Sequence, residues 1–216
     1  MNTKDQAYWE NKHPAIRQLY AGRPLPNGVS YNIDIRHFIW ADDYVLKDLI
    51  AKENLKDDNN DITANNMQKY VVQNLQYVSD EKLGRSEYWL FPGETLYMHR
   101  GDCEDGGILM ASLLLNALPV DQHWRVRVAA GNVWVSDKAP YGGHAYLTYC
   151  RCTDNEWVIC DWCYYQDSSI PVNKKPLAKD VGMYKDIWFS WNHLHSYSHM
   201  SFALAGRLNE KIFNTK

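Results

Sequence analysis

Residues 108–115 form a nearly continuous apolar run, and this run constrains the fold more than any other feature of the chain. A helix that is apolar on all sides is buried inside a protein, so the run predicts a central helix over residues 104 to about 118. A single cysteine, Cys103, stands directly before it. The N–H groups and the dipole at a helix N-terminus favour a thiolate, so Cys103 is a candidate nucleophile. The alternative is that Cys103 is a small buried residue, which is the commoner use of a lone cysteine.

The composition indicates one globular domain, because 216 residues can bury a sizeable core and the sequence shows no internal repeat. Lysine and arginine number 23 against 26 aspartate and glutamate, which gives a net charge of -3, and no basic cluster points to nucleic acid. No apolar run reaches the roughly 18 residues of a membrane span. The first residues are polar and lack the apolar segment of a secretion signal, so we expect a cytoplasmic protein that binds neither nucleic acid nor membrane.

The order of the predicted elements indicates the α+β class, because helices come before an antiparallel sheet. Apolar periodicity predicts helices over residues 8–20, 42–50 (with Asp42 as N-cap), 63–76 and 201–213. Alternation predicts strands over residues 125–130, 144–152, 156–162 and 186–192. Glycine and proline mark a loop at 22–28, and residues 79–98 look irregular. We therefore expect one domain over residues 1–216, with a core at about 63–165, a helical extension at 1–62 and a C-terminal extension at 166–216.

A nucleophilic cysteine needs a base that takes its proton and a third group that fixes the tautomer of that base. Among the eight histidines, His144 has the context of a base, because it follows two glycines at the start of a predicted strand. Asp161 ends the next predicted strand, and its odd separation from His144 lets the two share one face of an antiparallel hairpin. If His144 lay directly opposite Asp161, the turn of the hairpin would be centred between residues 152 and 153, whereas the best turn residues are 154 and 155. A bulge or a staggered pairing would reconcile the two.

Four short motifs carry a family resemblance: Gly-Asp-Cys-Glu-Asp at 101–105, Arg-Val-Arg-Val at 125–128, Gly-Gly-His-Ala-Tyr at 142–146 and Glu-Trp-Val-Ile-Cys-Asp at 156–161. Together they resemble the transglutaminase-like superfamily, and most closely its small bacterial and phage-borne cysteine proteinases. Residues 88–96 are also similar to the segment before the cysteine in those proteins. The resemblance covers roughly residues 63–162. It implies a papain-like core, in which a central helix carrying Cys103 packs on an antiparallel sheet carrying His144 and Asp161.

The resemblance also implies roles for the site residues. Cys103 would be the nucleophile, His144 the general base and acid, and Asp161 the group that orients the imidazole. The oxyanion would be stabilised by the backbone N–H of Cys103 and by a second donor upstream. Trp89 and Gln76 are the candidates for that donor, and Trp89 is preferred. The residues expected at the substrate cleft are Gly143, Tyr146 and Trp162.

Two glycines, Gly106 and Gly107, follow the Cys-Glu-Asp motif where the family often has an aromatic residue. Each glycine lowers the intrinsic stability of a helix by about 1 kcal/mol. We expect them to leave room for substrate or for a neighbouring loop.

No cofactor is expected, although Asp102 and Glu104 are candidate calcium ligands. A calcium-dependent subset of these proteinases binds the ion through acidic residues at such positions. The preferred interpretation is that Glu104 and Asp105 complement the helix dipole. Their negative charge would raise the pKa of the Cys103 thiol unless a cation or a protonated His144 compensates.

Four further cysteines crowd at positions 150, 152, 160 and 163, and the odd total of five leaves at least one outside any internal pair. Without a secretion signal, all five are expected to be reduced. A zinc site would need the four thiols to converge, whereas alternation places them on opposing faces of one hairpin. We interpret them as packing residues.

The predicted function is cysteine-dependent acyl transfer on amide bonds of a protein or peptide substrate, with a cysteine peptidase as first choice. The alternative is a protein-glutamine transglutaminase or deamidase, because a Cys-His-Asp triad does not decide whether water or an amine resolves the acyl-enzyme. A third hypothesis, of another class, is a catalytically silent binding or assembly module with the same fold. The sequence leaves the oligomeric state open.

Overall fold

The computed structural model describes residues 19–25, 27–84, 87–134, 142–164, 168–184 and 186–198. Five strands form its main sheet, and they are β5 (Val126–Asn132), β6 (Gly143–Cys150), β7 (Trp157–Cys160), β8 (Asp186–Trp191) and β9 (Ser196–Ser198). The sheet is antiparallel, with strand order β7-β6-β5-β8-β9. The helices are α2 (Tyr44–Lys52), α3 (Asn60–Asn74), α4 (Pro92–Met98) and α5 (Cys103–Ala117). This mixed architecture is the α+β class that the sequence predicts.

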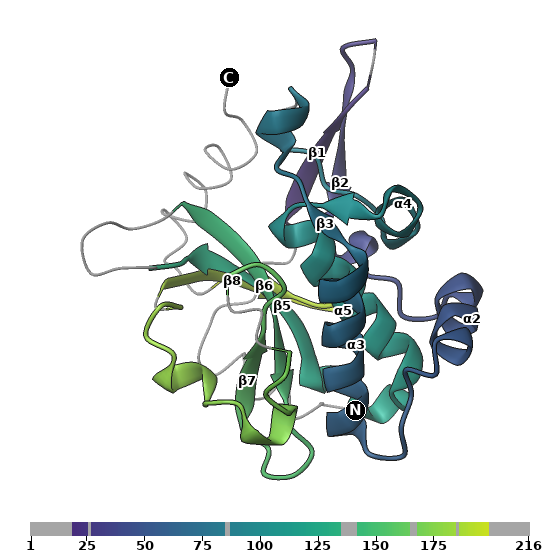
Figure 1. Ribbon diagram of the computed structural model, residues 1–216. Coiled ribbons are helices and arrows are strands. Elements are labelled where there is room, and N and C mark those ends of the chain that lie inside the picture. Colours follow the sequence, from purple (N-terminus) through teal and green to yellow (C-terminus); the bar gives the residue numbers. More distant parts are fainter. Residues whose placement is uncertain are drawn as a thin grey trace.

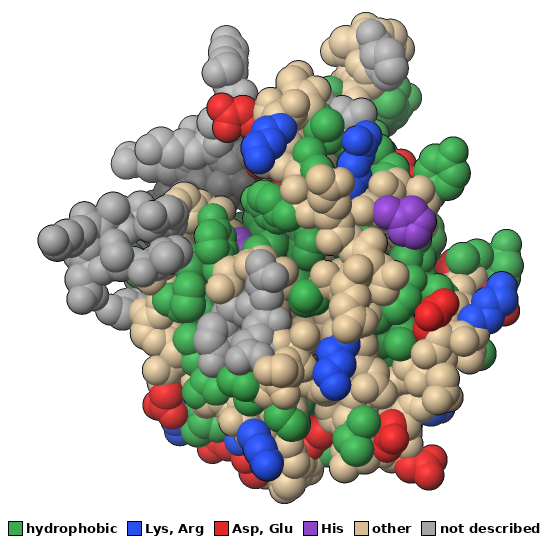
Figure 2. Space-filling view, viewed as in Figure 1, with side chains coloured by type: hydrophobic (Ala, Val, Ile, Leu, Met, Phe, Trp, Pro, Cys, Tyr) green, Lys and Arg blue, Asp and Glu red, His purple; other side chains and the backbone are tan. Residues whose placement is uncertain are grey.

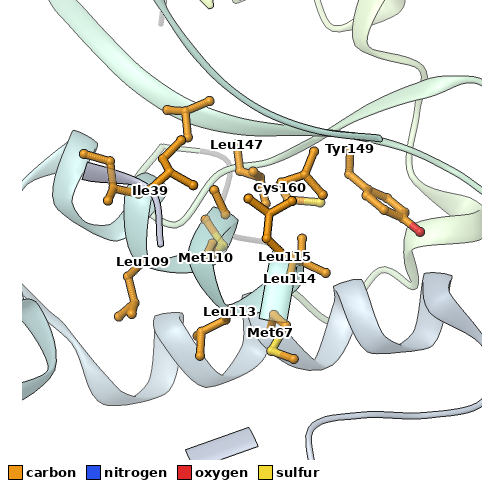
Figure 3. Close-up of a cluster of buried hydrophobic side chains, with 14 of the residues drawn as sticks. Ile39, Met67, Leu109, Met110, Leu113, Leu114, Leu115, Leu147, Tyr149 and Cys160 are labelled. Carbon is orange, nitrogen blue, oxygen red and sulfur yellow. The ribbon is translucent and has the colours of Figure 1, made fainter. Parts of the chain in front are cut away.

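Helix α5 is the centre of the molecule, because it packs against β5 and β6 on one side and against α2, α3 and α4 on the others (Figure 1). The apolar run along α5 is buried from Ile108 to Leu115. In Figure 3, Leu109 and Leu113 extend toward α3, while Leu147 and Cys160 reach the same core from the sheet. The predicted central helix is therefore confirmed, and its apolar circumference follows from having neighbours on all sides.

The hairpin of β6 and β7 explains how His144 and Asp161 share a face. Leu147 lies opposite Cys160 and Tyr149 opposite Val158, so Asp161, the next residue, comes opposite Tyr146 rather than His144. His144 is therefore offset by two residues from the position directly opposite Asp161. Because an offset of two residues does not change the face of a strand, the two side chains still share one face, as predicted. Residues in such a diagonal arrangement on one face are close enough for long side chains to contact each other.

Helix α3 fixes the turn of this hairpin. Asp61, near the start of α3, accepts hydrogen bonds from the backbone N–H of Cys152 at 2.8 Å and of Thr153 at 3.2 Å. It also accepts one from the hydroxyl of Tyr149 at 3.0 Å. Further along α3, Gln68 Nε2 donates to the backbone oxygen of Asp161 at 2.7 Å. These contacts hold the strand that carries Asp161 against α3.

The N-terminal part departs from the helical extension that the sequence predicts. Residues 22–24, expected in a loop, belong to β1 (Tyr20–Pro24), which pairs antiparallel with β2 (Ser30–Asp34). Beyond the last pair of the hairpin, the N–H of Leu25 donates to Val29 O at 2.7 Å, and Gly28 adopts a positive φ of 81°. Glycine and proline are tolerated in a two-stranded hairpin because each strand has one unpaired edge. Most of the predicted helix at 8–20 lies outside the described residues.

Two helix starts also differ from the prediction. Asp43, not Asp42, caps α2, because its carboxylate accepts the backbone N–H of Leu46 at 3.0 Å. Asp42 pairs with Lys47 instead. Helix α3 begins three residues earlier than predicted, at Asn60.

Four further elements were not predicted. Helix α4 lies in the segment expected to be irregular, and its first turn is set by Pro92 and by Glu94, which accepts the N–H of Phe91 at 2.8 Å. The short strands β3 (Gln76–Tyr77) and β4 (Arg100–Gly101) pair in parallel, and β4 ends two residues before Cys103. Strand β9 joins β8 in the main sheet, so the C-terminal extension supplies two of its five strands. The helix predicted at 201–213 lies outside the described residues.

The visible surface has no strongly charged region. Charged side chains of both signs are scattered over the face shown in Figure 2, and neither sign forms a large patch there. That face therefore lacks the basic stripe typical of nucleic-acid binding. Among the described residues, no helix combines the length and apolar character needed to cross a bilayer.

Candidate active site

Cys103 is the first residue of α5, and a set of local contacts fixes the start of this helix. Asp105 folds back so that its Oδ2 accepts the backbone N–H of Asp102 at 3.2 Å, while its Oδ1 accepts that of Leu90 at 2.8 Å. A β-carbon on Gly101 would lie 2.5 Å from the Cβ of Asp105, so only glycine fits there. Asp105 therefore fixes the helix start through hydrogen bonds, whereas the expectation that Glu104 and Asp105 complement the helix dipole stays a prediction.

The glycine at position 106 makes room for a tryptophan. A β-carbon on Gly106 would lie 2.2 Å from the ring of Trp162, whereas one on Gly107 would meet nothing closer than 3.6 Å. Trp162 is buried, and its Nε1 donates to the backbone oxygen of Cys103 at 3.1 Å. The sequence left open whether substrate or a neighbouring loop fills the space beside these glycines. The structure shows that the loop residue Trp162 fills the space beside Gly106. The assignment of Trp162 to the substrate cleft is accordingly corrected: its ring is buried and supports the backbone of Cys103 from inside the protein.

His144 and Asp161 form a buried hydrogen-bonded pair. His144 Nε2 lies 2.6 Å from Asp161 Oδ2, and the two side chains are 2% and 0% exposed. Asp161 Oδ2 also accepts the hydroxyl of Tyr184 at 2.5 Å, and its Oδ1 accepts the backbone N–H of Cys163 at 2.8 Å. Burial alone would raise the pKa of Asp161, but hydrogen bonding and charge from His144, together with these two donors, hold that pKa below its ordinary value. A buried Asp161 whose pKa favours the ionised form therefore faces the imidazole of His144.

The structure brings Cys103 to the same end of β6, but its thiol points to a carboxylate. The backbone N–H of Ala145, the residue after His144, is near the Cys103 sulfur and acts to lower the pKa of the thiol. The thiol itself donates to Glu104 Oε2 at 3.2 Å. No hydrogen bond between Cys103 and His144 is present in the described part of the chain. Burial and the charge of Asp102 raise the pKa of the Cys103 thiol well above its ordinary value, which keeps the sulfur protonated in this arrangement.

Four acidic side chains converge beside the thiol. Carboxylate oxygens of Asp80, Asp102 and Glu104 lie within 4.8 Å of one another, and Glu87 contacts Glu104. Glu104 Oε1 and Asp102 Oδ1 are buried and have no hydrogen-bond partner among the residues that the structure describes. Burial first, and then mutual repulsion, raises the pKa of Glu104 well above its ordinary value and that of Glu87 to about 7. Sequence spacing identifies only Asp102 and Glu104, because Asp80 and Glu87 come from a separate segment.

The two oxyanion candidates lie in different surroundings. Trp89 is buried between Phe38 and Trp191, and its Nε1 donates to Glu87 Oε1 at 3.1 Å. Its N–H is thus engaged by the acidic cluster, which corrects the preference for Trp89 as an oxyanion donor. Gln76 lies on β3, exposed, one residue before a tyrosine whose ring reaches the site.

That tyrosine, Tyr77, and a second one, Tyr164, were not predicted. Tyr77 is 46% exposed, and its ring packs on Trp162 with centroids 5.8 Å apart. Burial and the nearby Cys103 raise the pKa of its hydroxyl. Tyr164 is 47% exposed, and its ring meets that of His144 edge-on at 4.7 Å. Because both are exposed and adjoin the candidate catalytic residues, they are available to substrate.

The remaining cleft candidates have other surroundings. Tyr146 is buried and stacks on His144 at 5.9 Å, so it supports the imidazole instead of lining a cleft. Gly143 is exposed, but a β-carbon there would lie 2.7 Å from the ring of Trp188. This glycine therefore accommodates Trp188, and its predicted contact with substrate stays a prediction.

The cysteines other than Cys103 are distributed as packing residues. Cys150 and Cys160 are buried in the sheet, whereas Cys152 and Cys163 are partly buried. All five cysteines fall in the described ranges, and no disulfide joins them. Within those ranges the one cluster that could hold a metal is the acidic cluster, so the four cysteines do not converge.

Comparison with known proteins gives a match at the level of structure. LapG from Legionella pneumophila aligns over 78% of this chain and 84% of its own, with 22% identity and a TM-score of 0.52. The calcium-bound LapG structure covers 76% of this chain and 86% of that chain, with 22% identity and a TM-score of 0.53. For EGTA-treated LapG the coverage is 78% and 84%, the identity 21% and the TM-score 0.52. No family model and no curated protein matches the sequence. The likeness to LapG shows that this chain has the fold of LapG, a mixed fold of helices and an antiparallel sheet.

Proposed function

We propose that this chain is a cysteine peptidase of the transglutaminase-like type, with Cys103, His144 and Asp161 as its catalytic triad. The observation that carries the proposal is the buried 2.6 Å hydrogen bond between His144 Nε2 and Asp161 Oδ2. The pair lies at the start of β6, where the backbone N–H of Ala145 acts to lower the pKa of the Cys103 thiol. A base and its orienting carboxylate are thereby assembled beside a cysteine at a helix N-terminus, which is the arrangement that nucleophilic catalysis needs.

The pair of His144 and Asp161 supports a proton path from the thiol. Asp161 holds the tautomer of His144 that carries its proton on Nε2, which leaves Nδ1 to take the proton of Cys103. The sulfur then attacks the carbonyl carbon of an amide, and the carbonyl electron pair moves onto oxygen. The backbone N–H of Cys103, at the first position of α5, stabilises that oxyanion. His144 returns the proton to the departing amine as the C–N bond breaks, and water hydrolyses the thioester with His144 again as base.

The hydrogen bond from Cys103 to Glu104 must open before the thiol can donate to His144. This requirement connects the proposed activity with the acidic cluster, since Glu104 belongs to both. The orphaned oxygens Glu104 Oε1 and Asp102 Oδ1 fit a divalent cation, and calcium prefers oxygen ligands of this kind. Asp80, Asp102 and Glu104 would hold the ion. When bound, it would supply positive charge that offsets the carboxylates beside the thiol. LapG, which has calcium-bound and EGTA-treated structures, supports calcium as the ion.

The substrate class follows from the same surroundings. Tyr77 and Tyr164 present exposed aromatic rings beside Trp162 and His144, and such rings commonly contact peptide chains in clefts. We therefore propose a protein or peptide substrate that packs an apolar side chain against these two rings.

The proposed function is tested by incubating the full chain with casein, calcium and a labelled primary amine, followed by mass spectrometry. We expect new peptide termini, without incorporated amine. Glutamine deamidation would instead indicate a deamidase, and amine incorporation a transglutaminase. Cys103→Ala should abolish the product, whereas Cys152→Ala, which removes a partly buried thiol beside Asn60, should not. Absence of every product in the presence of calcium would contradict the proposal and favour a catalytically silent binding module.

A further inference from the structure

Tyr184 comes from the C-terminal segment, which carries no motif of the resemblance, yet it reaches the centre of the proposed triad. Its hydroxyl donates to Asp161 Oδ2 at 2.5 Å, the same oxygen that lies 2.6 Å from His144 Nε2. Tyr184 is buried, and burial together with Asp161 raises the pKa of its phenol, so the hydroxyl keeps its proton and remains a donor at neutral pH. The carboxylate oxygen that orients the imidazole is therefore shared between two donors.

The fold holds Tyr184 in this place from several sides. The residue lies between the short 3-10 helix η5 (Ala178–Asp180) and β8, and its backbone N–H donates to Val181 O at 3.1 Å. The preceding oxygen, Met183 O, accepts the N–H of Trp134 at 2.7 Å. The ring meets that of Tyr146 edge-on at 4.5 Å. The phenol is thus fixed by backbone and ring contacts that do not involve Asp161.

The hydrogen bonds of Asp161 show what Tyr184 contributes to its orientation. Oδ1 is held by the backbone N–H of Cys163, and Oδ2 receives both side-chain donors. The phenol limits rotation of the carboxylate and supplies a donor to a charge that no solvent reaches. Without it, a fully buried carboxylate would lose one of its three hydrogen bonds, and the imidazole would depend on a less constrained acceptor.

We propose that Tyr184 is a positioning residue of the triad, which acts through Asp161 to keep its Oδ2 aimed at His144 Nε2. The inference rests on the proposed function of Cys103, His144 and Asp161. Tyr184 touches neither the thiol nor a substrate in this assignment. The titratable groups that face Asp161 are His144 and Tyr146 from β6, Cys160 from β7, Cys163 from the following loop, and Tyr184 itself.

The test is Tyr184→Phe in the full chain, with Tyr149→Phe as the matched control. Tyr149 also donates a buried phenol to an aspartate, Asp61, and it lies on β6 but away from the triad. The rate at which iodoacetamide alkylates Cys103 is followed against pH in the presence of calcium. For Tyr184→Phe we expect the rate near neutral pH to fall about tenfold, and the acid side of the profile to move up by about one pH unit. The acid side moves upward because Asp161, with one donor fewer, is protonated more easily.

The control should lower the melting temperature and leave the alkylation profile of Cys103 unchanged. An unchanged profile in Tyr184→Phe, or an equal change in Tyr149→Phe, would overturn the proposal. A second readout does not depend on activity: in the Cys103→Ala background, the proton NMR signal of His144 Nε2–H should shift when Tyr184 becomes Phe. If Cys103 proves unreactive in the wild type, the proposed function fails, and this signal still decides the role of Tyr184. No movement of the signal would contradict that role.

Discussion

Gly106 and Gly107 are neighbours in α5 but meet different surroundings, and this difference gives a prediction at the scale of single residues. Gly106→Ala places a methyl group against the ring of Trp162, so we expect the free energy of unfolding to fall by about 1–3 kcal/mol. Gly107→Ala meets only ordinary contacts, so it should be neutral or raise stability by up to about 1 kcal/mol through helix propensity. Urea unfolding of the two variants measures the difference. Equal effects would show that Trp162 does not require the glycine.

Asp161 gives a pH-dependent prediction at the same scale. Its pKa in the folded chain lies below the ordinary value of 3.8, so its contribution to stability is fully present above that pH and is lost as pH falls through the folded value. Asp161→Asn breaks a buried pair and should cost about 3 kcal/mol at neutral pH. The difference in the free energy of unfolding between the wild type and Asp161→Asn should become smaller as the pH falls toward about 3. Urea unfolding across this range is the measurement, and a gap that stays constant down to the acid end would contradict the assignment.

At the scale of elements, the strands show which features could be predicted from the sequence and which could not. The alternation of β6 and β7 was enough to predict that His144 and Asp161 share a face, because parity depends on spacing alone. The two-residue stagger depends on α3, whose Asp61 fixes the turn through contacts with residues distant in sequence. The hairpin of β1 and β2 was missed for a different reason. Its glycine and proline have loop propensity, and pairing with β2 overrides it.

The acidic cluster is formed by Asp80 and Glu87 together with Asp102 and Glu104 at the start of α5. Calcium binding between these two parts of the chain gives a prediction at the scale of elements. If the cluster binds calcium, the ion should stabilise the folded chain by about 2.7 kcal/mol at a concentration of 100 times Kd, which corresponds to a rise of about 5–10 °C in Tm. Glu104→Gln removes one ligand charge and should abolish most of this rise, while Asp58→Asn, on the exposed connector, should keep it. A thermal melt with calcium and with EDTA measures the effect. An equal rise in all three proteins would place the calcium site elsewhere.

At the scale of the whole molecule, the sequence identified the class of fold and the three residues of the proposed triad, because these depend on one apolar run and on local motifs. It did not identify Asp80, Glu87, Tyr77, Tyr164 or Tyr184, since each reaches the site only through tertiary packing. The expectations of one domain over residues 1–216 and of a cytoplasmic location stay predictions.

The central claim is that Cys103 is a nucleophile activated by His144, and residue-resolved alkylation tests it most directly. The full chain, with calcium, is treated with iodoacetamide at about pH 6, where an ordinary thiol with a pKa near 8.5 is almost entirely protonated. Mass spectrometry then gives the labelling rate of each of the five cysteines. We expect Cys103 to react at least about tenfold faster than the other four, and His144→Ala to remove this difference. Equally slow labelling of all five cysteines in the wild type would contradict the claim.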